Sequence, residues 1–142
     1  MARYVAEIRS KLAPAEAFAY MADFSNARFW DPSVTSSRHE NDHPIALGSS
    51  FAVVSRFARR DVKLTYAIVE YEPPTRVVLE ARPSYVSRDT ITVTADGEGS
   101  LVRYDAVLAF GAVGRLFDPI MQRIFDRVGA KAKAGLETAL NP

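Results

Sequence analysis

Apolar and polar side chains alternate along much of the second half of the chain. In residues 101–110 every second side chain is apolar, and Arg103 and Asp105 lie between them. The apolar positions are Val102, Tyr104, Ala106, Leu108 and Phe110. Upstream, Ile91 and Val93 alternate with threonines. A period of two places alternate side chains on opposite faces, so these segments predict β-strands with one covered face and one face in water.

Further strands are predicted on either side of a helical stretch. Residues 4–12 read as a first strand, and from residue 34 onward runs rich in Val, Thr, Tyr and Phe are separated by turn sequences. These turns are HPIALGS, ARRD, EPPT, RPSYVS and DGEGS. Residues 62–71 are apolar in both alternating sets, so the register of this strand stays open. A strand with two apolar faces is a candidate contact with a second subunit, which makes a homodimer one expectation.

Helical spacing occurs in two places. In PAEAFAYMAD, Pro14 suits the first turn of a helix that should end near Asp23, and residues 25–30 can add a further turn before Pro32. Near the carboxyl end, apolar residues recur at steps of three and four: Leu116, Phe117, Ile120, Met121, Ile124, Phe125, Val128, Ala132, Leu136 and Ala139. Pro119 either begins this helix after Asp118 or kinks a longer one that begins near Ala112. Strand, helix, a run of antiparallel strands and one long helix predict an α+β fold with the helices on one side of the sheet.

Composition and charge narrow the class of protein. The 142 residues are the usual size of one domain, here 1–142. A net charge of +1 gives no strong field toward nucleic acid or an anionic membrane. There is no cysteine, which excludes disulfides and thiolate chemistry and suits the cytoplasm. The first residues lack the apolar core of a signal peptide, and no apolar run approaches the roughly 18 residues of a membrane-spanning helix.

The order of these elements, together with local motifs, resembles the helix-grip fold of the START and Bet v 1-like (SRPBCC) superfamily. The similarity is strongest to its polyketide cyclase/dehydrase and lipid-transport group. The motifs that carry it are LAPAEAFAYMADFSNARFWDPSV, Gly48 before a strand that begins at Phe51, VEYEPPTRVVLE and GAVGRLFDPIMQRIF. The resemblance covers nearly the whole chain. It implies a curved antiparallel sheet of about seven strands wrapped around a long C-terminal helix, with two short helices after the first strand.

The resemblance also implies an internal cavity between the concave sheet face and the last helix. An apolar container with a few polar groups is how small-molecule sites are usually built. The expected ligand-binding residues are Trp30, Phe51, Val53, Ser55, Tyr66, Leu79, Tyr104, Leu108, Phe117, Met121 and Phe125. Trp30, the only tryptophan, has two readings: an aromatic wall at the mouth of the pocket, or a packing residue that seats the short second helix on the sheet.

Other candidate chemistry is sparse. His39 and His43 lie in RHENDHP, and on an extended strand they would be about 13 Å apart, which predicts a polar strand end and no metal site. Asp31 precedes Pro32 and reads as a turn residue. No GxSxG, phosphate-loop or GxGxxG motif occurs, so no cofactor is expected, and the GAVG of residues 111–114 reads as a strand-to-helix turn whose amides could bind a ligand's carbonyl or anionic end.

Three functions follow, and the residues leave open whether the chain is an enzyme. The leading hypothesis is a binding protein for a hydrophobic small molecule such as a lipid, quinone or polyketide, which Tyr66 and Tyr104 would orient. The second is a polyketide cyclase/dehydrase that acts on a chain held by an acyl-carrier protein, with Arg56 or Arg88 assisting the tyrosines. Its case is weakened because TYAIVEYEPP is largely apolar where the better known cyclases, as the resemblance implies, carry a polar and basic strand. The third is a protein-interaction module without a ligand.

Overall fold

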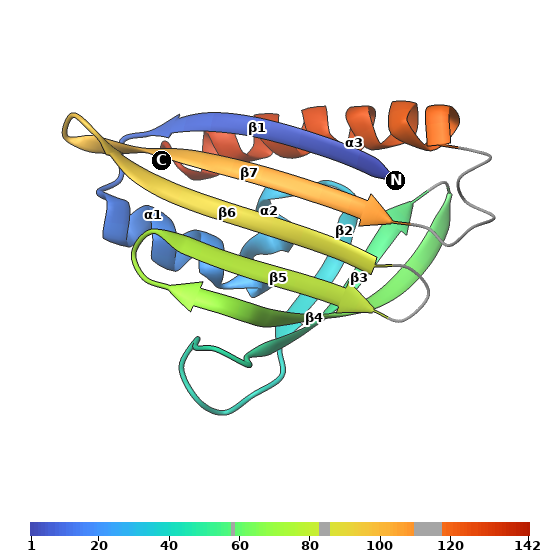
Figure 1. The fold of residues 1–142 in the computed structure, drawn as a ribbon, viewed down its shortest axis with the longest axis horizontal. Helices are drawn as coiled ribbons and strands as arrows, with labels where there is room; N and C mark the ends of the chain where they lie inside the picture. The colour runs from blue at the N-terminus through green and yellow to red at the C-terminus, as the bar shows by residue number, and fades with distance from the viewer. Residues whose placement is uncertain (58, 83–85, 110–117) are drawn as a thin grey trace.

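A single seven-stranded antiparallel sheet forms the frame of the molecule in the computed structural model, which describes residues 1–57, 59–82, 86–109 and 118–142. The strands are β1 (Ala2–Ser10), β2 (Val34–His39), β3 (Ser50–Phe57), β4 (Arg60–Glu72), β5 (Arg76–Arg82), β6 (Val86–Asp96) and β7 (Gly99–Ala109). Their order across the sheet is β1-β7-β6-β5-β4-β3-β2, so every neighbouring pair except β1 and β7 is consecutive in the chain (Figure 1). The predicted α+β class and strand number are confirmed.

Four helical segments complete the fold: α1 (Pro14–Ala22), the 3-10 turn η1 (Phe24–Asn26), α2 (Ala27–Trp30) and α3 (Asp118–Ala139). Pro14 occupies the first turn of α1, as predicted. Asp23 follows the helix and its Oδ1 accepts a hydrogen bond from the Ser25 amide at 3.1 Å, which starts η1. Pro119 is the second residue of α3 as the structure describes it, and the choice between its two predicted roles depends on the residues before Asp118. The alternative start near Ala112 falls outside the described residues. Among the described residues, no helix combines the length and apolar character needed to span a membrane.

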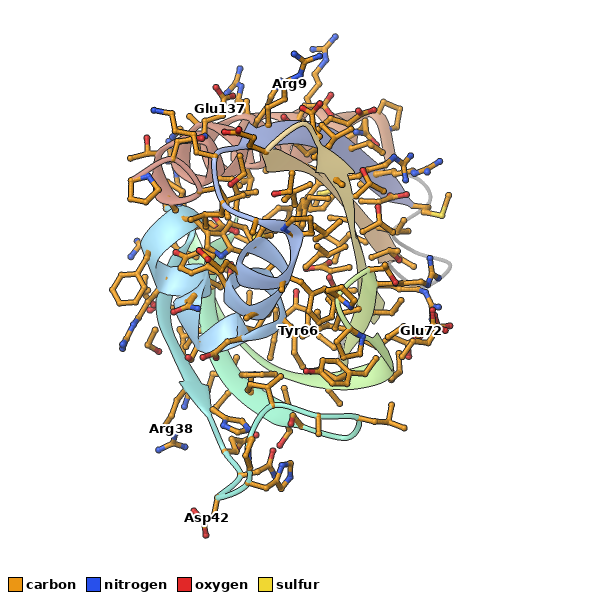
Figure 2. All side chains as sticks on the ribbon, turned by 90° about the vertical axis from the view of Figure 1, so that its left-hand side faces the viewer. Arg9, Arg38, Asp42, Tyr66, Glu72 and Glu137 are labelled. Atoms are coloured by element: carbon orange, nitrogen blue, oxygen red, sulfur yellow. The ribbon has the colours of Figure 1, made fainter. Side chains whose placement is uncertain are left out.

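The sheet curls strongly, and α3 runs beside β1 across its open side (Figure 1). Figure 2 shows the curl end-on, with side chains filling the space between the sheet and the helices. Two glycines let α3 come close. A Cβ on Gly135 would lie 1.9 Å from the Trp30 carbonyl oxygen, and a Cβ on Gly129 would lie 2.3 Å from the Tyr4 ring. Neither position has room for a side chain, so these glycines fix the distance between α3 and the rest of the fold.

The core consists of the inward-facing residues of the strands and one face of each helix. Burying each large apolar side chain contributes roughly 1.5–3 kcal/mol. In β4 the structure settles the open register: Leu64, Tyr66 and Ile68 are buried. The pairing with β5 shifts between Ile68 and Glu70, and this bulge returns Tyr71 to the inner side, where its ring lies 5.7 Å from that of Phe18. The bulge explains why Tyr71, which belongs to the other alternating set, is apolar.

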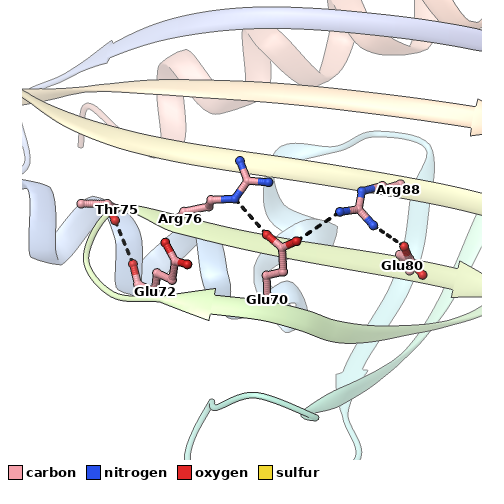
Figure 3. A network of polar contacts seen from close by, with 6 residues as sticks. All are labelled: Glu70, Glu72, Thr75, Arg76, Glu80 and Arg88. Carbon is pink, nitrogen blue, oxygen red and sulfur yellow. Dashed lines mark hydrogen bonds and ion pairs between the residues drawn. The ribbon is translucent and has the colours of Figure 1, made fainter.

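The outer face of β4, β5 and β6 carries an ion-pair network (Figure 3). Arg76 Nε donates to Glu70 Oε2 at 2.9 Å. Arg88 pairs with Glu80 and, at 3.4 Å, with Glu70. Arg88 therefore lies on the opposite face of the sheet from the interior. Its predicted role as an assistant to the interior tyrosines is wrong, because alternation turns its side chain outward.

Candidate functional site

A small cavity lies between the concave face of the sheet and α3. It consists of three adjacent compartments of about 70, 50 and 30 Å³, all lined by Asp31 and Tyr104. It is surrounded by the turn after α2, by the inner faces of the four strands β3, β4, β6 and β7, and by the face of α3 that carries Phe125 and Val128. Together the compartments are comparable in volume with a cavity of roughly 150 Å³, which can hold one benzene ring.

The structure brings most of the predicted ligand-binding residues to this cavity. Those that line it are Trp30, Val53, Ser55, Tyr66, Tyr104, Leu108 and Phe125. Phe51 and Leu79 are instead fully buried core residues, and half-buried Met121 lines none of the three compartments. Phe117 and the GAVG amides lie outside the described residues. Which of the predicted positions reach the cavity depends on where the packing leaves space.

A buried carboxylate, absent from the sequence prediction, is the central polar group. Asp89 is only 2% exposed. Its Oδ2 accepts a hydrogen bond from the Tyr104 hydroxyl at 2.9 Å, and its Oδ1 accepts one from Ser87 Oγ at 3.4 Å. The hydroxyls of Ser87 and Tyr66 are 3.1 Å apart, so four side chains form one chain of hydrogen bonds. Buried polar networks of this kind hold their members in fixed positions when every group has a partner.

Burial determines the protonation of the Asp89 carboxyl group. Desolvation raises the pKa of Asp89 to about 7; the hydrogen bonds from Tyr104 and Ser87 oppose the rise, and the nearby charge of Asp31 adds to it. The pKa of Tyr104 is raised well above its usual value, first by desolvation and then by the charge of Asp89. Near neutral pH the Asp89 carboxyl can therefore either donate or accept a proton.

Asp31 has both the predicted turn role and a place in the cavity. Its Oδ1 accepts hydrogen bonds from the Ser33 amide at 2.9 Å and from Ser33 Oγ at 2.7 Å. Desolvation raises its pKa, although these hydrogen bonds oppose the rise. The Ser33 hydroxyl is also 3.3 Å from that of Ser55, which connects the turn to β3. The turn thus places a second carboxylate beside Asp89.

Trp30 is a core packing residue that also lines the cavity, and it is too deeply buried to stand at the mouth of a pocket. It is 1% exposed, and its ring packs edge-on against Tyr104 at 5.5 Å and against Phe24 at 5.9 Å between ring centroids. The Trp30 backbone carbonyl contacts Gly135, so Trp30 packs the short helix α2 against α3. It also lines the compartment that contains Asp89. Within the described part of the chain, its indole Nε1–H has no hydrogen-bond acceptor.

The two histidines lie closer together than the strand spacing predicts. β2 ends at His39 and the chain turns, so the ring centroids of His39 and His43 are 6.0 Å apart rather than about 13 Å. His39 packs against the Phe51 ring at 5.2 Å, and His43 Nδ1 lies 2.8 Å from the Pro44 carbonyl oxygen. Among the described residues, no group of three His, Asp or Glu side chains is arranged to hold a metal ion.

The remaining predicted cation lies at the edge of the site. Arg56 is exposed and 3.9 Å from Asp61. With Lys131 and Ser33 it lines a surface hollow of about 210 Å³ next to the turn after α2.

The alternation that places Ile91 and Val93 inward also places Ser87 and Asp89 inward. That signal was available in the sequence, but a charged residue in a predicted strand is normally assigned to the wet face.

Comparisons with known proteins agree with this architecture. The family model described as polyketide cyclase / dehydrase and lipid transport matches residues 1–141. A crystal structure from Thermus thermophilus superposes with a TM-score of 0.80 at 15% identity, covering 97% of this chain and 96% of that one. A START superfamily protein from Mycobacterium smegmatis gives 0.76 at 8% identity, with 97% and 96% covered.

A plant protein shares the same architecture. The major latex-like protein of Panax ginseng gives a TM-score of 0.71 at 11% identity, with 99% of this chain and 97% of that chain covered. A sequence search among curated proteins found no match. Identities this low show a shared fold alone, whereas the family model spans almost every residue. The chain therefore belongs to the polyketide cyclase/dehydrase and lipid transport family.

Proposed function

We propose that the protein binds a small hydrophobic molecule in the cavity between the concave sheet face and α3. Family membership supports a hydrophobic ligand, since lipid transport and polyketide chemistry both involve one. The observation that carries the proposal is the hydrogen-bonded Asp89 and Tyr104 pair on the wall of a cavity that polar and apolar side chains line in similar numbers. A few convergent polar groups in such a cavity orient a bound molecule.

The position of Asp89 argues for a role beyond packing. Burying a carboxylate is costly even with hydrogen bonds, and an apolar residue of similar size would fill the same space at lower cost. The sheet also needs no charge at this point, because its neighbours Ile91 and Val93 on the same face are apolar and fully buried. A costly polar group that lines a cavity is therefore best explained by what it contacts there.

Ligand-dependent stabilisation tests the proposal. The freshly purified protein would be analysed by native mass spectrometry, and organic extracts of it would be assayed for an increase in melting temperature. A ligand that binds only the folded state at one hundred times its Kd adds about 2.7 kcal/mol. We expect Ala106→Met, which fills two of the compartments, to abolish this shift.

Val107→Met is the matched control. Val107 is the next residue of β7 and faces the outer side of the sheet, so its substitution should leave the ligand-dependent shift intact. Each variant is compared with its own ligand-free form, which removes any change in basal stability. If neither extracts nor panels of lipids, quinones and polyaromatic compounds shift the melting temperature, the cavity proposal is wrong. The small volume of the compartments would then favour the interaction module.

A second candidate is a polyketide cyclase or dehydrase. The observation that favours it is the Asp89 carboxyl, whose pKa of about 7 suits general acid or base catalysis at neutral pH. Such an enzyme would receive its chain from an acyl-carrier protein. Conversion of the bound molecule, lost in Asp89→Asn while binding persists, would support catalysis. Recovery of the ligand unchanged would support binding alone.

A further inference from the structure

In the described part of the chain, the ionisable carboxyl groups that line the cavity have no basic side chain among them. Among the described residues that line its three compartments, the only acidic or basic side chains are Asp31 and Asp89. Lys131 and Arg56 line the neighbouring hollow, which shares Ser33 and Val128 with one of the compartments. Two carboxylates in a desolvated space each disfavour a further negative charge, and no cation in the lining offsets them. A ligand with an ionised carboxylate would meet this repulsion directly.

The cavity also contains a donor that needs an acceptor. The Trp30 indole N–H has no acceptor among the described residues, although the side chain is 1% exposed and lines the compartment with Asp89. A buried donor left without a partner costs on the order of the desolvation of that group, so such donors nearly always have one. A ligand oxygen would supply the missing acceptor. A protonated amine would not, because it has no lone pair to offer.

Resting on the proposed function, we propose that the bound molecule presents an uncharged hydrogen-bond acceptor, a ketone, aldehyde or hydroxyl oxygen, to Trp30 Nε1. Repulsion from the two carboxylates disfavours acids. The same carboxylates would attract an amine, but an amine, like a plain hydrocarbon, would leave the indole donor without an acceptor. The hydroxyl groups around the site are compatible with a ligand that accepts a hydrogen bond. The hydroxyls of Tyr66 and Ser87 hydrogen-bond to each other, and Tyr104 donates to Asp89. When Asp89 is protonated, its carboxyl can donate to the same ligand oxygen.

Four probes with one benzene ring and closely related substituents test the inference: ethylbenzene, acetophenone, benzoate and benzylamine. They would be titrated at pH 7 into the ¹⁵N-labelled protein. Because Trp30 is the only tryptophan, the spectrum contains a single indole N–H signal. We expect acetophenone to bind roughly tenfold more tightly than ethylbenzene, the ratio that one additional hydrogen bond supplies, and to move the indole signal downfield. Benzoate should bind at least tenfold more weakly than acetophenone.

The outcomes separate the two proposals. Equal binding of ethylbenzene and acetophenone, or tighter binding of benzoate or benzylamine, would overturn the acceptor inference and leave the hydrophobic site in place. Failure of all four probes to bind would overturn the acceptor inference, while the melting-temperature panels test the hydrophobic site separately. In Trp30→Phe the preference for acetophenone over ethylbenzene should disappear. In the double variant Asp31→Asn, Asp89→Asn the discrimination against benzoate should fall. Asp105→Asn, which removes a carboxylate from the outer face of β7, is the matched control and should change neither ratio.

Discussion

Replacing Asp89 by asparagine removes a buried ionisable group while keeping its shape. The Tyr104 hydroxyl, now 2.9 Å from Asp89 Oδ2, can donate to the amide oxygen, and the amide nitrogen can donate to Ser87. The amide side chain that replaces the carboxyl group is neutral at every pH. The comparison of the two proteins therefore isolates the free energy of ionising one carboxyl group inside the fold.

The sign of the effect follows from the two pKa values. In the unfolded chain the carboxyl ionises near pH 3.9, whereas in the folded protein it keeps its proton up to a pKa of about 7. Between these values the unfolded chain binds fewer protons, so the free energy of unfolding of the wild type decreases as pH rises. Above about pH 7 the loss is complete. The pKa difference corresponds to about 4 kcal/mol.

Urea denaturation followed by circular dichroism from pH 4 to pH 8 measures this effect. The free energy of unfolding of Asp89→Asn minus that of the wild type should rise by about 4 kcal/mol over this range. A difference that is constant with pH, or that falls, would refute the assignment of a raised pKa to Asp89. Asp31 stays ionisable in both proteins, so its own titration largely cancels.

Asp105→Asn provides a control of opposite sign. Asp105 lies on the outer face of the same strand as Tyr104, and the hydrogen bonds from Arg3, at 3.0 and 2.7 Å, lower its pKa. The folded pKa lies below the unfolded one, so this carboxylate stabilises the wild type above about pH 4, and the contribution is lost as pH falls further. Its asparagine variant should therefore show no change in the difference from pH 5 to pH 8.

Three further substitutions test the packing and the polar groups. Gly135→Ala should lower the free energy of unfolding by about 1–3 kcal/mol, because the new Cβ would lie 1.9 Å from the Trp30 carbonyl oxygen. At an ordinary helix position the same change increases stability, so a gain in urea denaturation would contradict the close approach of α3. Tyr104→Phe should lower the free energy of unfolding by about 1–3 kcal/mol at pH 8 and by less at pH 5, because the lost hydrogen bond stabilises the ionised form of Asp89. Equal losses at both pH values would contradict this. Arg88→Ala should cost less than about 1 kcal/mol, and less still in high salt, since its ion pairs are part-exposed; a larger cost, unchanged by salt, would show that the network is structural.

The local patterns of the sequence were sufficient to predict most of the elements and the α+β class. Alternation over residues 101–110 predicted β7 and its inner face, since the side-chain period of a strand is a property of the backbone alone. The steps of three and four predicted α3, and Pro14 marked the start of α1. These features extend over a few residues each. No long-range information is needed to read them.

The site depended on contacts between distant parts of the chain. Asp31 follows α2, Asp89 lies in β6 and Tyr104 in β7, and only the curl of the sheet and the close approach of α3 enclose them in one cavity. The register of β4 likewise required the bulge between Ile68 and Glu70, which no period reveals. The sequence could place Asp89 on an inner face, but its raised pKa comes from the loss of water around it. Desolvation is a property of the packed interior, so only the tertiary structure could make this residue the centre of the site.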